Sequence, residues 1–155
     1  MADPTIEAAR EVLVASLDEL LKTLDGLPSE DLNRRPAGEG SNPLAVIAAH
    51  ALFSTRSWLS LATGAPLPER DRPAEFRTVA GAGFLGWVDG IAAECRRLLD
   101  GDVAFDPGRT GTAPWRSDDP TAPITAAWAL LHALDHLGEH VGHAHLTRQL
   151  LDERG

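Results

Sequence analysis

The amino-acid sequence predicts an all-α fold, a bundle of four helices. Four stretches of the chain repeat apolar residues at steps of three and four, which is the period of a helix. Glycine and proline interrupt the chain between these stretches, and no segment alternates apolar and polar residues convincingly, as a strand does. The length of 155 residues suits one domain, 1–155, with a sizeable core. Together these observations favour helices packed on helices.

The first predicted helix begins near Thr5, a candidate N-cap, and is ended by Gly26 and Pro28. Residues 28–42 are polar and form a connection. The acidic side chains of this helix fall away from its apolar stripe, so one face is expected to point into the core. That stripe consists of Ala9, Leu13, Leu17, Leu20, Leu24 and Leu27.

The second predicted helix begins at Pro43, with Asn42 as its N-cap. Proline suits the first helical position because its missing N–H has no partner there in any case. Gly64 and Pro66 close the helix. The connection that follows, 64–77, is rich in proline and charge, and Asp71 and Arg72 within it are candidates for covering a site.

The third helix is predicted from about 78 to 99 and the fourth from about 121 to 151. Four glycines weaken the third helix, each by up to about 1 kcal/mol relative to alanine, so tertiary packing must stabilise it. Residues 100–120 are predicted to form a second extended loop. The two long connections follow the second and third helices, and both are longer than ordinary helix–helix loops. Connections of such length are typical of functional segments or of a chain that crosses the end of a bundle.

Composition excludes several classes of function. The chain has a formal net charge of −9 with a single lysine, which argues against a nucleic-acid partner or an anionic membrane surface. Nothing approaches 18 consecutive apolar residues, and the N-terminus lacks the pattern of a signal peptide. The one cysteine, Cys95, cannot form an internal disulfide, which suits a reducing cytoplasm.

Five of the six histidines lie between residues 132 and 145. Placed on a helix at about 100° per residue, four of these form one stripe about 80° wide: His132, His136, His140 and His143. His145 falls on the opposite side of the helix and is predicted to lie at the surface. The apolar residues that continue the edges of the stripe indicate that this face points at least partly inward.

Histidines at positions i and i+4 can bind one metal ion, because their rings project from adjacent turns on the same face. The remaining histidine, His50, lies in the middle of the second predicted helix and can supply a third ligand. Spacing alone leaves the register open, since His132/His136 and His136/His140 are both such pairs. Spacing also leaves open two alternatives to a metal site. The histidine stripe can be a packing face that responds to pH, and His50 can be a core residue that is simply hydrogen-bonded.

Three segments of the chain resemble a known family: LNRRPAGEGSNPLAVIAAHALFSTRSWL, ERDRPAEFR and WALLHALDHLGEHVGHAHLTRQLLD. They resemble the second-helix motif, the loop before the third helix, and the last helix of the DinB/YfiT-like superfamily. The resemblance implies a four-helix bundle with a metal near one end, often in a homodimer. It places the metal ligands at His50, His136 and His140.

The resemblance also implies a function. Better understood branches of the family look like transferases and isomerases that use a small thiol, so the expected cofactors are a divalent metal, zinc or nickel, and a low-molecular-weight thiol. A metal-bound thiol becomes a nucleophile at neutral pH, and a metal-bound water supports hydrolysis. The alternative is a metal- or small-ligand-binding module without catalysis. In either case we expect the partner to be a small molecule. We also expect the protein to be cytoplasmic.

Other side chains are candidates for supporting roles. His132 and His143 flank the predicted ligands and are candidates for orienting them or contacting substrate, as is Glu139 at the edge of the stripe. Trp115, in the second long loop, is predicted to flank the mouth of a pocket. The remaining aromatic and thiol candidates are predicted to pack in the core: Trp58, Trp87, Trp128 and Cys95.

Overall fold

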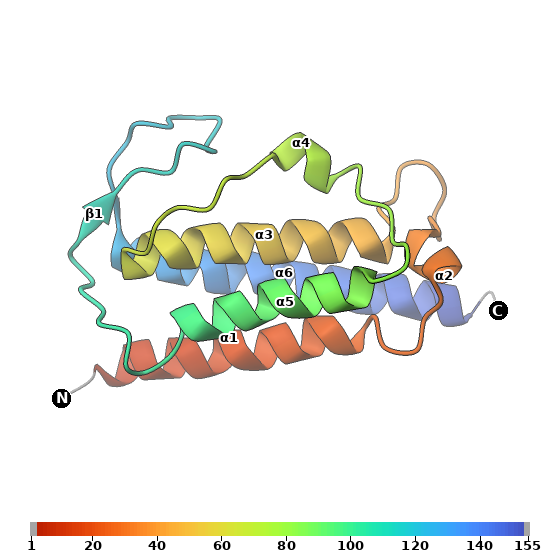
Figure 1. The fold of residues 1–155 in the computed structure, drawn as a ribbon, viewed down its shortest axis with the longest axis horizontal. Coiled ribbons are helices and arrows are strands. Elements are labelled where there is room, and N and C mark those ends of the chain that lie inside the picture. The colour runs from red at the N-terminus through yellow and green to blue at the C-terminus, as the bar shows by residue number, and fades with distance from the viewer. Residues whose placement is uncertain (1–2, 154–155) are drawn as a thin grey trace.

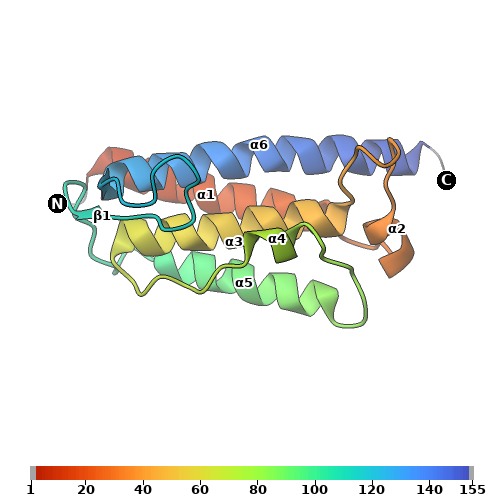
Figure 2. The ribbon, with the colours of Figure 1, turned by 90° about the horizontal axis from the view of Figure 1, so that it is seen from above.

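The computed structural model describes residues 3–153 and confirms the all-α prediction. Four long helices lie side by side along the molecule (Figures 1 and 2). The chain runs in one direction along α1 and α6 and in the opposite direction along α3 and α5 (Figure 1). These helices are α1 (Pro4–Lys22), α3 (Leu44–Thr63), α5 (Phe84–Leu98) and α6 (Ala126–Asp152).

Helix α3 is the core of the bundle and packs against both α5 and α6. Among residues 3–153 it is the one helix with the length and hydropathy of a membrane span, yet 89% of that window is buried inside the protein. Leucine side chains of α1 fill the core opposite α6, where Leu13, Leu17 and Leu20 are fully buried. The apolar stripe predicted for the first helix therefore faces the core.

Two predicted helix starts differ from the structure by one or two residues. Asp3, rather than Thr5, caps α1, because its carboxylate accepts a hydrogen bond of 2.8 Å from the backbone N–H of Thr5. Helix α3 begins at Leu44, so Pro43 takes the cap position and Asn42 is not the N-cap. Its predicted end is correct, since Gly64 adopts the left-handed conformation (φ 76°) that ends a helix.

The third predicted helix is shorter than expected. Residues 78–83 are not helical, and α5 begins only after Gly83, whose φ is 85°. The Asn33 side chain accounts for the difference. Its amide donates to the carbonyl of Ala80 at 2.8 Å and accepts from the N–H of Ala80 at 2.7 Å, so this backbone is bonded outside a helix.

The predicted connections contain short elements that the sequence did not indicate. Helix α2 (Ser29–Asn33) lies in the first connection and α4 (Arg72–Glu75) in the second. Strands β1 (Thr110–Gly111) and β2 (Ile124–Thr125) pair antiparallel, and two residues are too few to show an alternating pattern. Because β2 occupies residues that were predicted as helix, α6 begins at Ala126, with Thr125 as its N-cap.

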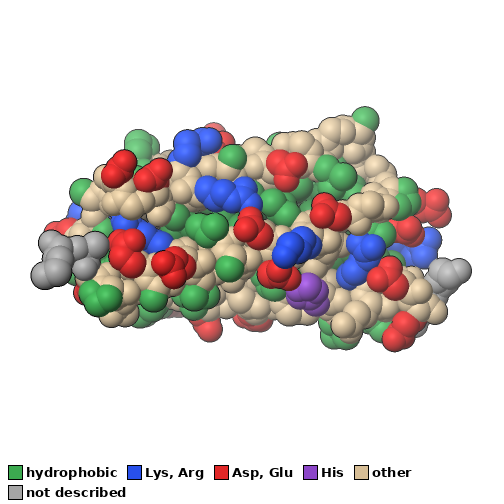
Figure 3. Space-filling view, turned by 90° about the horizontal axis from the view of Figure 1, so that it is seen from below, with side chains coloured by type: hydrophobic (Ala, Val, Ile, Leu, Met, Phe, Trp, Pro, Cys, Tyr) green, Lys and Arg blue, Asp and Glu red, His purple; other side chains and the backbone are tan. Residues whose placement is uncertain are grey.

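The predicted core residues divide into buried and exposed groups. Cys95 is fully buried, and burial raises the pKa of its thiol to about 12. Trp58 is buried as predicted, whereas Trp87 and Trp128 are 42% and 45% exposed, so the prediction that they pack in the core is wrong. The face of the molecule in Figure 3 carries acidic and basic side chains interspersed with hydrophobic ones, without a continuous basic stripe.

Candidate metal centre

The structure brings three of the predicted histidines together. His50 comes from α3, and His136 and His140 come from successive turns of α6. Each offers a ring nitrogen, and the three nitrogens lie within 4.8 Å of one another. The distances between ring centroids are 5.1 Å for His50–His136, 4.9 Å for His50–His140 and 4.5 Å for His136–His140.

A buried carboxylate orients His50, and the sequence did not indicate it. The Nδ1 atom of His50 lies 2.7 Å from Oε2 of Glu75, whose side chain is 2% exposed. Because a carboxylate oxygen can only accept, Nδ1–H of His50 is the donor in this bond, and Nε2 is the ring nitrogen left to bind a metal. In metal sites such a carboxylate partner sets the tautomer and orientation of a ligating histidine.

Glu75 is in turn held by an arginine. Arg70 donates to both of its oxygens, with Nε at 2.7 Å and Nη2 at 3.1 Å, and its own side chain is 5% exposed. Helix α4 presents Glu75 to the site, and Asp71 caps that helix by accepting from the N–H of Ala74 at 3.0 Å. The charge of Glu75 is therefore compensated within a buried chain Arg70–Glu75–His50.

Burial sets the protonation of the cluster. It lowers the pKa of His136 to about 3 and that of His140 to about 4, with further lowering from neighbouring histidines. Burial also tends to raise the pKa of Glu75, but hydrogen bonds from His50 and Arg70 outweigh it and hold this pKa below its ordinary value. At neutral pH the rings of His136 and His140 are thus uncharged, which is the state that binds metals.

These residues fit a divalent ion. Three imidazole rings are a donor set that suits zinc, nickel, iron or copper. The Nδ1 atoms of His136 and His140 are buried and have no hydrogen-bond partner among residues 3–153. Because unpaired buried polar atoms cost free energy, the cluster by itself is incomplete.

Comparison with known proteins identifies the family. The family model of the DinB superfamily matches residues 13–144. This chain belongs to the DinB superfamily. A solved structure, described as the conserved protein of locus from Enterococcus faecalis, is similar to this DinB protein with a TM-score of 0.70 and 19% identity over 98% of this chain and 99% of that one. At that identity the likeness shows the fold alone. Comparison with curated proteins gave no match.

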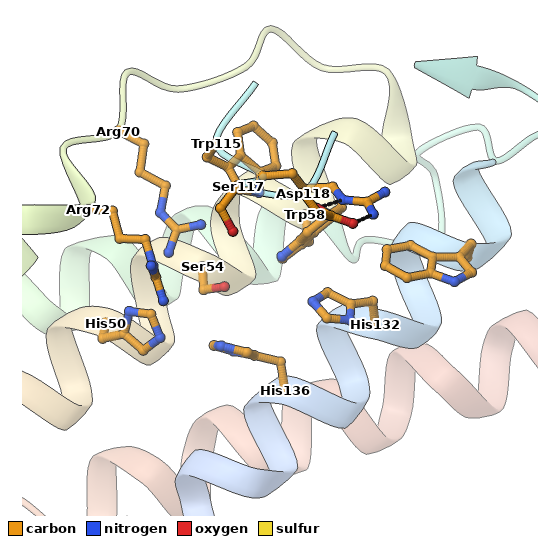
Figure 4. A pocket seen from close by; sticks show the side chains of 12 residues that line it. His50, Ser54, Trp58, Arg70, Arg72, Trp115, Ser117, Asp118, His132 and His136 are labelled. Atoms are coloured by element: carbon orange, nitrogen blue, oxygen red, sulfur yellow. Dashed lines mark hydrogen bonds and ion pairs between the residues drawn. The ribbon is translucent and has the colours of Figure 1, made fainter. Parts of the chain in front are cut away.

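In this DinB protein a pocket of about 350 Å³ opens beside His50 and His136 (Figure 4). Trp115 lines it, which agrees with its predicted place at a pocket mouth, and so does Arg72 from the connection predicted to cover a site. Asp71, the other residue named for that role, caps α4 instead. Several lining residues were not predicted to belong to a site: Ser54, Trp58, Arg70, Arg116, Ser117, Asp118 and Trp128.

The other predicted site residues lie around the cluster. His132 lines the pocket, where its ring stacks on that of Trp128 at 4.8 Å, and burial lowers its pKa. His143 is exposed, with its ring 6.2 Å from that of His140. Glu139 is exposed on α6, and its side chain forms no hydrogen bond or ion pair within residues 3–153. His145 is also exposed and lies 3.6 Å from Glu19 of α1, away from the cluster.

Proposed function

We propose that this DinB protein is a metal-dependent enzyme that acts on a small molecule. Three histidines, His50, His136 and His140, would hold a divalent ion, with zinc or nickel as the candidates. The observation that carries the proposal is the convergence of the three ring nitrogens within 4.8 Å beside an open pocket. Three protein ligands leave positions for exchangeable ones, which is the pattern of a catalytic rather than a structural zinc site.

The residues of the chain prepare this site in two ways. Glu75 orients His50, and burial keeps His136 and His140 neutral, so little of the binding free energy is spent on ordering or deprotonating ligands. A bound divalent ion supplies Lewis acidity, which lowers the pKa of a water or thiol beside it. From the family resemblance we propose transfer to or from a low-molecular-weight thiol, or hydrolysis, as the reaction class.

A second candidate is a metal-binding module without catalysis. The observation that favours it is the pairing of both carboxylates beside the pocket. Glu75 is bonded to Arg70, and Asp118 is bonded to Arg116. Neither is therefore free to act as a general base. A nucleophile activated by a bound ion needs no carboxylate base, so this observation weighs only against reactions that require one.

Elemental analysis of purified variants tests the metal site. His50→Ala, His136→Ala and His140→Ala should each lose stoichiometric metal, whereas His145→Ala should keep it. Circular dichroism verifies that each variant is folded. Full metal content in the His50 variant would contradict the proposed ligand set.

Turnover with a panel of thiols and electrophiles then separates the two candidates. Metal-dependent turnover that disappears in the His136 variant supports the enzyme. Stoichiometric metal without turnover of any thiol, ester or amide in the panel supports the binding module.

A further inference from the structure

We propose that the pocket beside the three histidines binds small organic anions that carry a flat, unsaturated ring. Arg72 would be the main contact of the anionic group, and the tryptophan side chains would contact the ring. This inference rests on the proposed function, because it takes this pocket to be the substrate site. It adds the chemical class of the substrate, which the metal ligands do not specify.

The first observation is an unbalanced positive charge. In a chain of net charge −9, three arginines line this pocket, Arg70, Arg72 and Arg116. Arg70 is neutralised by Glu75, and Arg116 is paired with Asp118. Arg72 forms no ion pair with any residue of the described chain, and its guanidinium lies over the ring of Phe76, 5.6 Å from the centroid.

An unpaired guanidinium at a pocket wall attracts and orients an anion. Its planar donors match a carboxylate or phosphate, which they can bind through two parallel hydrogen bonds. Arg72 is an exposed residue, so its donors are accessible to an anion that enters the pocket. In Figure 4 the Arg72 side chain lies on the same side of the pocket as His50, so an anion bound by Arg72 would sit close to the histidine cluster.

The second observation is an aromatic wall at the other side of the pocket. Trp58 contacts both Trp115 and Trp128 edge to face, with ring centroids 5.2 Å and 5.4 Å apart. The ring of His132 stacks on Trp128 with an interplanar angle of 10°. Trp128 is nevertheless 45% exposed, and the buried Nε1 of Trp115 has no hydrogen-bond partner in the described part of the chain.

Such a wall favours a flat ring in the ligand. Aromatic faces and edges bind other unsaturated rings better than equal areas of saturated carbon, because their quadrupoles are complementary. A pocket of about 350 Å³ is at the small end of the range for ligand sites, so it suits a molecule of one or two rings. An exposed indole on one side of the pocket and an unpaired guanidinium on the other side are both explained if one ligand spans the pocket and covers them.

The experiment measures binding of 2-naphthoate to the full chain, by tryptophan fluorescence and calorimetry, in the metal-loaded form and after chelation. The probes for comparison are 2-naphthamide, which lacks the charge, and decahydro-2-naphthoate, which lacks the unsaturated ring. We expect the amide to bind about tenfold more weakly and the saturated acid about threefold more weakly, in both forms of the protein. Equal affinity for naphthoate and naphthamide, or no binding in either form, overturns the proposal.

Two pairs of matched variants locate the binding. Arg72→Gln should weaken naphthoate about fivefold, whereas Arg77→Gln, an exposed arginine that does not line this pocket, should change nothing. Trp128→Leu should abolish the preference for the unsaturated ring, and Trp87→Leu, of similar exposure, should preserve it.

The same variants distinguish this inference from the proposed function. If naphthoate binds only to the metal-loaded form and Arg72→Gln behaves like Arg77→Gln, the metal recognises the anion and this proposal is wrong, while the metal site stands. If the chain binds no metal but discriminates the probes as expected, the proposed function fails and the anion site stands.

Discussion

Glu75→Gln is the substitution that most directly tests the buried chain Arg70–Glu75–His50. The change keeps the shape of the side chain but removes its charge and one acceptor. Glutamine can still accept from Nδ1 of His50, yet its amide N–H₂ then faces the Nε–H donor of Arg70. Since the side chains of Arg70 and Glu75 are 5% and 2% exposed, the guanidinium is left buried without its counter-ion.

The cost follows from that burial. Removing one partner of a buried ion pair costs about 3 kcal/mol or more of unfolding free energy. For a chain of this length that corresponds to a fall of about 6–12 °C in the melting temperature. The weakened orientation of His50 should also reduce metal affinity by about 10- to 100-fold.

Urea denaturation of the metal-free protein and competition with a chromophoric chelator measure the two effects separately. Glu69→Gln is the matched control, because Glu69 is exposed on the same connection and forms no ion pair with the described residues. Adding Arg70→Met to Glu75→Gln should recover part of the stability, since it removes the unpaired cation, but not the metal affinity. Equal urea midpoints for Glu75→Gln and Glu69→Gln would refute the reasoning.

Two further predictions concern stability. His136 and His140 have folded-state pKa values of about 3 and about 4, below the 6.5 of an unperturbed histidine, so the unfolded chain takes up protons first as the pH falls. The metal-free protein should therefore lose about 1–2 kcal/mol between pH 7 and pH 5, after allowance for solvent screening, and urea midpoints for a His136→Gln/His140→Gln variant should fall less over that range. Gly64→Ala would place a Cβ at φ +76°, only 2.7 Å from Nη1 of Arg109, and should cost about 2–4 kcal/mol. The Arg109 guanidinium cannot move aside without losing its hydrogen bonds of 2.7 and 2.8 Å to the carbonyls of Leu61 and Ala62. Gly26→Ala, at φ +73° in open space, should cost about 1 kcal/mol, and equal thermal shifts for the two variants would contradict the contact with Arg109.

Local periodicity was sufficient to predict the four long helices and the histidine stripe. In a helix, side chains four residues apart lie on the same face, so the prediction of a helix over these residues also placed His136 and His140 on one face. The choice between the pairs His132/His136 and His136/His140 was not a matter of spacing. It depends on where His50 lies along α6, and the structure places His50 beside the second pair.

The features that periodicity missed are set by contacts between distant segments. Asn33 holds the backbone of Ala80 outside a helix, although 47 residues separate them. Glu75 has no periodic pattern around it, because α4 is a single turn. Glu139 was a reasonable candidate for the partner of a histidine by position, but its side chain is exposed. The predicted homodimer depends on a second chain and the predicted cytoplasmic location on the cell, so both stay predictions.

The order of the helices explains why the partner of His50 comes from a connection. Helices α3 and α5 run in the same direction, so the chain must return along the whole bundle between them (Figure 1). A helix of the length of α3 spans about 30 Å, and an extended chain needs about nine residues to cover that distance. The connection 64–83 is longer, which leaves room for α4 and for side chains that turn inward. A crossing that the topology requires therefore passes over His50, and it supplies Arg70, Arg72 and Glu75 to the site. Shortening this connection should thus impair metal binding before it impairs folding, since the four long helices hold most of the buried core.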